Sequence, residues 1–267
     1  MHPIERLRYV AGATGADPGV VAREAAYALA EVAATDAAGL VPACRRLVDR
    51  LPTAGPLWWL AARTLSAMDP AQAARQAADE LEGDPTAACL VRHLPEDATV
   101  VVVGWPEAVA SALRRRGDAE VLVVDAGGEG APLARRLAEA GSAVSLVAES
   151  GVGPAAAVAG LVLVEAHAAG PGGLLATPGS HAAAAVAAHA GVPVWAVLAV
   201  GRVLPGPLWE ALLARFDQVG EPWERRVELV AADLLGAAVG PEGITTVAGG
   251  LAAATCPAAP ELLRPAG

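Results

Sequence analysis

The sequence predicts an α/β protein in which a helical N-terminal domain is followed by a doubly wound, mainly parallel sheet. Up to about residue 95, apolar residues recur at helical spacing, and turns that contain proline separate the segments. From Thr99 onward, short β-branched apolar runs alternate with Ala-rich helical stretches. Such runs are typical of buried parallel strands, and their alternation with helices predicts right-handed crossovers within one sheet.

The first domain, residues 1–95, is expected to be all helical. Turn chemistry at Asp17-Pro18, Asp69-Pro70 and Gly83-Asp84-Pro85 marks boundaries between helices, because proline is tolerated in a first helical turn. The expected helices cover residues 4–10, 18–35, 37–50, 56–68 and 70–82.

The second domain, residues 96–251, should hold a Rossmann-like sheet. Its expected strands cover residues 99–103, 120–124, 143–147, 160–164 and 192–199, and its expected helices 106–116, 130–140, 153–159 and 180–190. Toward the C-terminus we expect a helix over 227–235 and an edge strand over 244–247. The Ala- and Pro-rich tail, 252–267, should be frayed.

Composition excludes several classes of function. All 19 basic residues are Arg, so the sequence has neither a Schiff-base lysine nor a Walker-type phosphate loop. The net charge of -10 argues against a nucleic-acid surface, which needs clustered cations. Aromatic residues make up only 3 % of the chain, so the core must consist mainly of Ala, Val and Leu.

The cysteines are too far apart in sequence to suggest a metal site or a disulfide framework. Cys44, Cys89 and Cys256 form no CxxC or Cys/His ligand spacing, so we expect neither metal nor other cofactor. The N-terminus lacks the apolar segment of a signal peptide, and Gly191 and Pro193 interrupt the longest apolar run. We therefore expect a cytoplasmic protein that binds neither nucleic acid nor membrane.

Polar residues and glycines follow the expected strands, where ligands bind in parallel sheets. Gly179 and Ser180 open a helix, and the free N–H groups there suit an anion, although Ser180 could equally be a helix cap. Asp125, Glu149 and Ser150 could bind ribose hydroxyl groups or cap neighbouring helices. Trp105, after Gly104, could stack on a base or sugar, or fill the space a ligand would need.

The order of elements resembles the translation initiation factor 2B alpha/beta/delta family, which includes methylthioribose-1-phosphate isomerase and ribose-1,5-bisphosphate isomerase. Residues 130–150 resemble a family segment with a Gly-led helix, a Gly turn and a strand. Gly179-Ser180 takes the place of a Gly-Thr helix start, and residues 191–195, GVPVW, resemble a Gly-Val-Pro-Phe-Tyr strand. Arg202 falls where the family usually has Lys, and residues 227–244 resemble the family's closing segment.

This chain departs from the isomerases at the residues that carry their chemistry. The resemblance implies a catalytic Cys where residues 103–106 read VGWP, and a catalytic Asp where His167 stands. Thr177-Pro178 replaces an Asn-Lys pair, and residues 125–128 replace a Glu-Thr-Arg-Pro stretch, so a phosphate-binding Arg is lost.

Glu165 and His167 are the candidate acid–base pair, because they lie two residues apart where the family has its catalytic Asp. A carboxylate beside an imidazole that titrates near neutrality can move a proton. The same two residues could instead form a structural ion pair or a polar rim of the pocket. The candidate ligand-binding residues are Gly104, Trp105, Asp125, Glu149, Ser150, Gly179, Ser180 and Arg202.

Two functions are consistent with the sequence. The first is binding of a phosphorylated sugar or nucleotide-like ligand, with divergent aldose–ketose isomerisation by Glu165 and His167. The second is a catalytically silent regulatory or scaffold protein that keeps the fold without turnover. Either way the resemblance implies a homodimer or higher homo-oligomer, to which Trp195, Trp209 and Trp223 could contribute unless the monomer core buries them.

Overall fold

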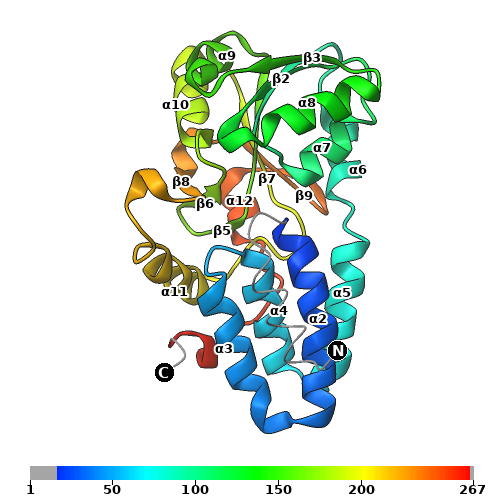
Figure 1. The fold of residues 1–267 in the computed structure, drawn as a ribbon, viewed down its shortest axis with the longest axis vertical. Helices are drawn as coiled ribbons and strands as arrows, with labels where there is room; N and C mark the ends of the chain where they lie inside the picture. Colours follow the sequence, from blue (N-terminus) through cyan, green and yellow to red (C-terminus); the bar gives the residue numbers. More distant parts are fainter. Residues whose placement is uncertain (1–16, 265–267) are drawn as a thin grey trace.

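The computed structural model describes residues 17–264, which form a helical half and an α/β half (Figure 1). The helix predicted for residues 4–10 lies outside the described residues. The helical half consists mainly of α2 (Pro18–Thr35), α3 (Leu40–Arg50), α4 (Gly55–Ser66) and α5 (Pro70–Glu82), with a short 3-10 turn, Ala37–Gly39, before α3. Within the described residues, no helix is both long and apolar enough to cross a bilayer.

Helix α2 begins where its first residues predict. The Asp17 side chain accepts hydrogen bonds from the N–H groups of Gly19 and Val20, and Pro18 occupies the first turn, where its missing N–H costs nothing. The buried face of α2 is mostly alanine, which lets its neighbours approach closely.

The α/β half is built on a seven-stranded sheet in the order β10-β9-β7-β4-β1-β2-β3, parallel except for β10. The expected strands are present as β1 (Thr99–Val103), β2 (Glu120–Val124), β3 (Ala143–Val147), β4 (Leu161–Glu165) and β7 (Val194–Val197). The sheet also contains β9 (Ala237–Gly240) and β10 (Gly243–Thr245), of which only an edge strand near 244–247 was expected.

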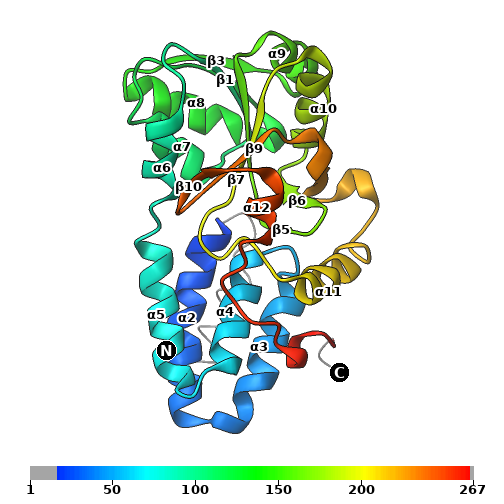
Figure 2. The same cartoon turned by 180° about the vertical axis from the view of Figure 1, so that it is seen from behind.

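Helices cover both faces of this sheet. One face packs against α6 (Thr86–His93), α7 (Glu107–Leu113) and α8 (Gly130–Glu139). The other packs against α9 (Val152–Val158), α10 (Ser180–Ala190) and α12 (Val247–Ala252). Figure 2 shows this layered arrangement from behind. The central strands are buried on both sides because their valines face one helix layer or the other.

A second, antiparallel sheet has the strand order β5-β6-β8 and lies beside the helical half (Figure 1). Its strands are β5 (Ala168–Gly170), β6 (Gly173–Ala176) and β8 (Glu228–Ala231). The helix predicted over 227–235 is therefore wrong. Its residues pair with β6, with Val230 opposite Leu174, and then form a 3-10 turn, Ala232–Leu234.

The structure also corrects two expectations about domain limits. Helix α6, inside the expected helical domain 1–95, packs under the sheet through Cys89 and Leu90. The tail, 252–267, was expected to be frayed, but its described residues pack against the helical half. Cys256 and Leu262 join the core of that half, together with α11 (Gly206–Phe216). Trp59 Nε1 donates a hydrogen bond to Thr255 Oγ1 at 2.8 Å, which fixes the same segment.

Candidate functional site

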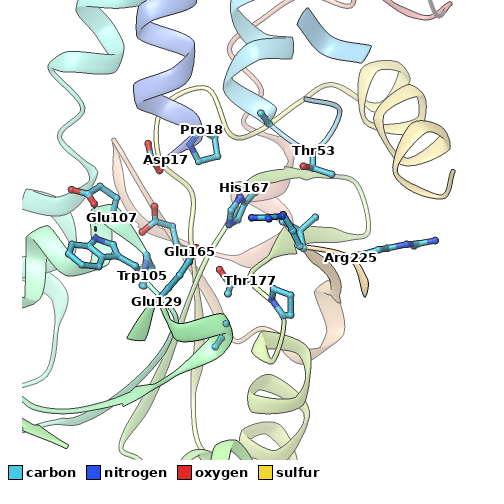
Figure 3. A pocket seen from close by; sticks show the side chains of 18 of the residues that line it. Asp17, Pro18, Thr53, Trp105, Glu107, Glu129, Glu165, His167, Thr177 and Arg225 are labelled. Atoms are coloured by element: carbon cyan, nitrogen blue, oxygen red, sulfur yellow. Dashed lines mark hydrogen bonds between the residues drawn. The ribbon is translucent and has the colours of Figure 1, made fainter. Parts of the chain in front are cut away.

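A cavity of about 910 Å³ lies between the helical half and the carboxyl ends of the parallel strands. The loops that follow β1, β2, β3 and β4 all contribute to its lining, as parallel sheets predict. Figure 3 shows the lining side chains, which converge from segments far apart in the sequence. Those with polar or aromatic side chains are Asp17, Thr53, Trp105, Glu107, Glu129, Glu149, Glu165, His167, Thr177, Arg202, Arg225 and Arg226.

Three charged residues at the inner end of this cavity form what we call the inner cluster: Asp17, Glu165 and Arg202. Arg202 Nη2 lies 2.8 Å from Asp17 Oδ2 and 3.8 Å from Glu165 Oε1. The Arg202 side chain is only 4 % exposed, so it depends on these carboxylates for its charge balance. Because Asp17 also caps α2, the cluster ties the helical half to the sheet.

Glu165, at the carboxyl end of β4, is held from two sides. Its Oε2 accepts a hydrogen bond from the backbone N–H of Val109, in the first turn of α7, at 3.0 Å. Burial raises the pKa of Glu165 to about 7, although the nearby Arg202 charge acts to lower it. The carboxyl group can therefore both lose and gain a proton at neutral pH, which suits a general acid or base.

His167 lines the same cavity two residues further on and is partly buried. Burial, with a further contribution from the Arg202 charge, lowers the pKa of His167 to about 4. The imidazole is thus neutral at pH 7, so the expectation that it titrates near neutrality is wrong. Glu165 is the member of the pair that titrates there.

Trp105 and Glu149 lie in the cavity wall, as ligand-binding residues would. The Trp105 Nε1–H donates to Glu107 Oε2 at 2.8 Å, and the Arg136 guanidinium lies over its ring at 5.6 Å. These contacts hold the indole at one side, so it does not fill the cavity (Figure 3). Gly104 supports this wall: its φ is 68°, and a Cβ there would meet Thr177 Cγ2 at 3.0 Å.

Asp125 and Ser150 have no part in the cavity lining. Asp125 Oδ1 accepts hydrogen bonds from the N–H groups of Gly130 at 2.9 Å and Ala131 at 3.0 Å, so it holds the start of α8. Ser150 lies in an exposed 3-10 turn after β3. Of the alternatives for Asp125, helix capping is the one that the structure shows.

Gly179 and Ser180 do not form an open anion seat. The N–H of His181, in the first turn of α10, donates to Glu228 Oε1 at 2.7 Å, so a carboxylate of the same chain occupies the end of the helix. Ser180 is buried, and its N–H donates to Thr177 O at 3.1 Å. Neither Gly179 nor Ser180 lines the cavity.

Two further cations that were not predicted from the sequence, Arg225 and Arg226, line the cavity. Arg225 is already engaged: its guanidinium lies over the Phe216 ring at 4.5 Å and its Nε donates to Val219 O at 2.9 Å. Arg226 is exposed, lines the cavity, and has no ion-pair or hydrogen-bond partner among residues 17–264. No sequence motif marks it; its availability depends on the path of the chain into β8.

Asp17 and Glu129 were also missed as cavity residues. Asp17 was interpreted only as a helix start, and its partner Arg202 is 185 residues away in the sequence. Glu129 follows β2 and is exposed at the cavity wall. Over residues 17–264, no group of three or more His, Cys, Asp or Glu side chains is placed to hold a metal ion.

Comparison with known proteins gives the fold. No protein-family profile matches the sequence, and no curated protein matches it. Translation initiation factor 2B from Pyrococcus horikoshii OT3 is 16% identical, with a TM-score of 0.71 over 91% of this chain and 96% of that chain. The tetrameric beta–delta complex of factor 2B from Chaetomium thermophilum contains a chain that is 19% identical, with a TM-score of 0.70 over 93% and 92% of the two chains.

The same fold is found in an enzyme. The 5-methylthioribose 1-phosphate isomerase from Pyrococcus horikoshii OT3 is 15% identical, with a TM-score of 0.63 over 91% of this chain and 84% of that chain. This chain therefore has the α/β fold shared by factor 2B subunits and this isomerase, which confirms the resemblance at the level of the fold.

Proposed function

We propose that this chain is a divergent member of the initiation factor 2B and sugar-phosphate isomerase superfamily that binds a phosphorylated sugar or nucleotide-like ligand in the cavity. The observation that carries the proposal is the cavity itself. It is about 910 Å³, lies at the carboxyl ends of the strands, and stays open beside Trp105. This volume suits a sugar phosphate or a nucleotide-like ligand.

The distribution of charge orients the ligand. Glu107, Glu129 and Glu149 follow β1, β2 and β3 and can accept hydrogen bonds from sugar hydroxyl groups, while the Trp105 ring offers an apolar face. The phosphate group binds at Arg226, since Glu228 occupies the alternative position at α10. Figure 3 shows Glu107 and Glu129 on one side of His167 and Arg225 on the other.

The chemistry that fits this arrangement is a proton transfer between adjacent carbons. The Glu165 carboxylate removes the proton from the carbon next to the substrate carbonyl, and neutral His167 gives its ring proton to the carbonyl oxygen, which yields an enediol. The imidazole then takes the proton of the other enediol hydroxyl group, and the Glu165 carboxylic acid returns its proton to the former carbonyl carbon, so that the second oxygen becomes the new carbonyl and aldose and ketose are exchanged. A pKa of about 7 for Glu165 suits both halves of this step.

The ligand is tested first by thermal unfolding with ribose phosphates, nucleoside monophosphates and inorganic phosphate. A ligand at 100 times its Kd should stabilise the native protein by about 2.7 kcal/mol and raise Tm. The absence of a shift with every sugar phosphate and nucleotide would reject the proposal. For any sugar phosphate that binds, interconversion of aldose and ketose is then followed in the wild type and in His167→Ala, which should lose most of the turnover.

A silent scaffold is the second candidate, and the contacts of Glu165 favour it. The carboxylate is bound by the first turn of α7 and by Arg202, so it also has a structural task. Under this alternative, Glu165→Gln lowers stability, ligands bind in the wild type, and no bound sugar phosphate is converted. Measurable turnover that Glu165→Gln abolishes would decide for the enzyme.

A further inference from the structure

One guanidinium in the inner cluster is shared by two carboxyl groups, and it is shared unequally. The Nη2 atom of Arg202 donates a hydrogen bond to Asp17 Oδ2 at 2.8 Å, but it lies 3.8 Å from Glu165 Oε1, beyond hydrogen-bond distance. Figure 3 shows Asp17 reaching this end of the cavity from the helical half and Glu165 from the sheet. The cation of the α/β half therefore has its closer partner in the helical half.

Both oxygens of Asp17 are engaged, so its side chain has one defined position. Its Oδ1 accepts hydrogen bonds from the N–H groups of Gly19 at 2.7 Å and Val20 at 3.1 Å, and its Oδ2 binds Arg202. The backbone of Arg202 is anchored as well, because its carbonyl oxygen accepts a hydrogen bond from the N–H of Ala169 in β5 at 2.7 Å. The start of α2 and strand β5 thus fix the Asp17–Arg202 pair from two sides.

The geometry leaves Arg202 able to pair with Glu165 if Asp17 releases it. Glu165 Oε2 accepts the N–H of Val109, whereas Oε1 lies toward Arg202. Arg202 also keeps a spare donor, since its buried Nε has no hydrogen-bond partner among residues 17–264. An approach of about 1 Å would turn the present contact into a hydrogen-bonded ion pair. Asp17 opposes that approach because it holds the same nitrogen atom.

The unequal sharing gives the two carboxyl groups different charge states. Burial acts to raise the pKa of Asp17, but the charge and the hydrogen bond of Arg202 outweigh it and hold this pKa below its usual value. Burial raises the pKa of Glu165 to about 7, because the more distant Arg202 offsets it only in part and the Asp17 charge adds to the rise. Asp17 is thus a permanent charge at neutral pH, while Glu165 exchanges a proton.

Two other titratable groups border the inner cluster. Burial lowers the pKa of His167 to about 4, so this ring carries no charge at pH 7. Asp84, between α5 and α6, also attracts Arg202 through its charge. Its two oxygens accept hydrogen bonds from the N–H groups of Thr86 at 2.8 Å and Val200 at 2.9 Å. The carboxylate that is hydrogen-bonded to the Arg202 side chain is therefore that of Asp17.

We propose that Asp17 is a positioning residue for Glu165: it binds Arg202 and so keeps this cation from forming a hydrogen-bonded pair with the Glu165 carboxyl group, which stays able to exchange a proton. Asp17 acts through Arg202 and needs no contact with the ligand. The catalytic use of the proton rests on the proposed function, whereas the hold of Asp17 on Arg202 does not.

Titration of Glu165 tests the proposal without any ligand. Carbon-13 NMR of labelled Glu side chains follows it, and the signal that is lost in Glu165→Gln assigns it. In Asp17→Asn the amide oxygen can still cap α2, but Arg202 should move toward Glu165, and the pKa of Glu165 should fall by about 1 or more.

Asp69→Asn is the matched control for this titration. Asp69 caps α5 in the same half, where it accepts the N–H of Gln72 at 3.0 Å, and it lies outside the inner cluster. This variant should leave the pKa of Glu165 unchanged. A pKa that stays the same or rises in Asp17→Asn, or that falls equally in Asp69→Asn, would overturn the proposal.

A double variant shows whether Asp17 acts through Arg202, and it keeps the test decisive if Asp17→Asn folds poorly. Replacing a buried ion pair as a whole is tolerated better than removing one partner. In Asp17→Asn/Arg202→Met only burial acts on Glu165, so its pKa should rise above the wild-type value. If Asp17 acted by its own negative charge alone, this pKa would fall in the double variant too, and the proposal would be wrong.

The pH profile of turnover tests the catalytic part. For a sugar phosphate that the wild type converts, the acid limb of kcat/KM reports the loss of the Glu165 proton. It should move to lower pH in Asp17→Asn by as much as the titration does, and stay in place in Asp69→Asn. A limb that stays in place while the pKa of Glu165 falls would reject the catalytic role of Asp17. If the wild type converts no sugar phosphate, the proposed isomerisation fails and the catalytic role with it, while the titration still decides whether Asp17 controls Glu165.

Discussion

Two arginines that line the cavity, Arg202 and Arg226, have different tasks. Arg202 is buried between Asp17 and Glu165, and its charge is balanced within the protein. Arg226 is exposed at the cavity wall and has no partner among residues 17–264. The difference teaches that residue type alone does not define a binding group. A buried cation that already has carboxylate partners is structural, whereas an exposed, unpaired one is available to a ligand.

The largest expected effect comes from removing the buried cation. Arg202→Met should lower the free energy of unfolding by about 3–5 kcal/mol, because it leaves Asp17 and Glu165 buried without a counter-charge. Urea unfolding at neutral pH measures this effect. The matched control, Arg226→Met, should stay within about 0.5 kcal/mol of the wild type. Equal losses in both variants would erase the distinction between the two arginines.

The pH dependence of stability should separate Glu165 from His167. Burial raises the pKa of Glu165 from 4.5 to about 7, so the native state holds its proton more tightly than the unfolded state, and stability falls as pH rises across this range. Burial lowers the pKa of His167 from 6.5 to about 4, so stability rises with pH between these values. In the wild type the two effects oppose each other.

Single variants should reveal each slope. Glu165→Gln leaves the His167 contribution, and its stability should rise by about 3 kcal/mol from pH 4 to 6.5. His167→Asn leaves the Glu165 contribution, and its stability should fall by about 3 kcal/mol from pH 4.5 to 7. Urea unfolding across this pH range measures both. If stability changed with pH in the same direction in both variants, the charge states assigned to Glu165 and His167 would be wrong.

Replacement of the exposed Arg226 should weaken ligand binding and hardly change the stability of the fold. For a sugar phosphate that binds the wild type, Arg226→Ala should raise Kd roughly tenfold, since one charge-assisted contact to the phosphate is lost. Isothermal titration calorimetry measures this change. The corresponding non-phosphorylated sugar serves as the control ligand and should bind both proteins alike. An unchanged Kd for the phosphate ester would place the phosphate elsewhere.

The smallest effect is expected at the carboxylate that occupies the start of α10. Glu228→Gln should lower stability by about 0.3–1 kcal/mol, because a negative charge near a helix N-terminus is stabilising. The same change should tighten phosphate binding a few-fold, because it removes a negative charge two residues from Arg226. Unfolding and titration with inorganic phosphate measure the two effects. Weaker phosphate binding in this variant would contradict the assignment.

Local sequence patterns predicted the central strands and most of the helices well. The limits of α2, α5, α10, β1, β2 and β3 agree with the sequence expectation, because proline turns, glycine ends and β-branched runs act within a few residues. The error over 227–235 has a physical cause. The local sequence around Leu229 and Val230 is also compatible with a helix. In the folded chain, however, pairing with β6 satisfies the backbone N–H and C=O groups of these residues.

Prediction of the site was less complete because its chemistry depends on contacts between distant segments. Trp105, Glu149, Glu165, His167 and Arg202 were expected and line the cavity, since strand ends gather at one side of a parallel sheet. Asp125 and Ser180 were candidates of the same kind, yet one caps a helix and the other is buried. Arg226 carried no local signal at all.

The sequence by itself determined the α/β class, the strand ends that could form a site, and the loss of the Cys and Asp expected at the isomerase positions. Only the tertiary structure decided which charges are free. Asp17 neutralises Arg202, Glu228 occupies the start of α10, and burial rather than residue type sets the pKa values of Glu165 and His167. Charge balance and desolvation depend on which segments meet in the folded chain, and local sequence patterns do not contain that information.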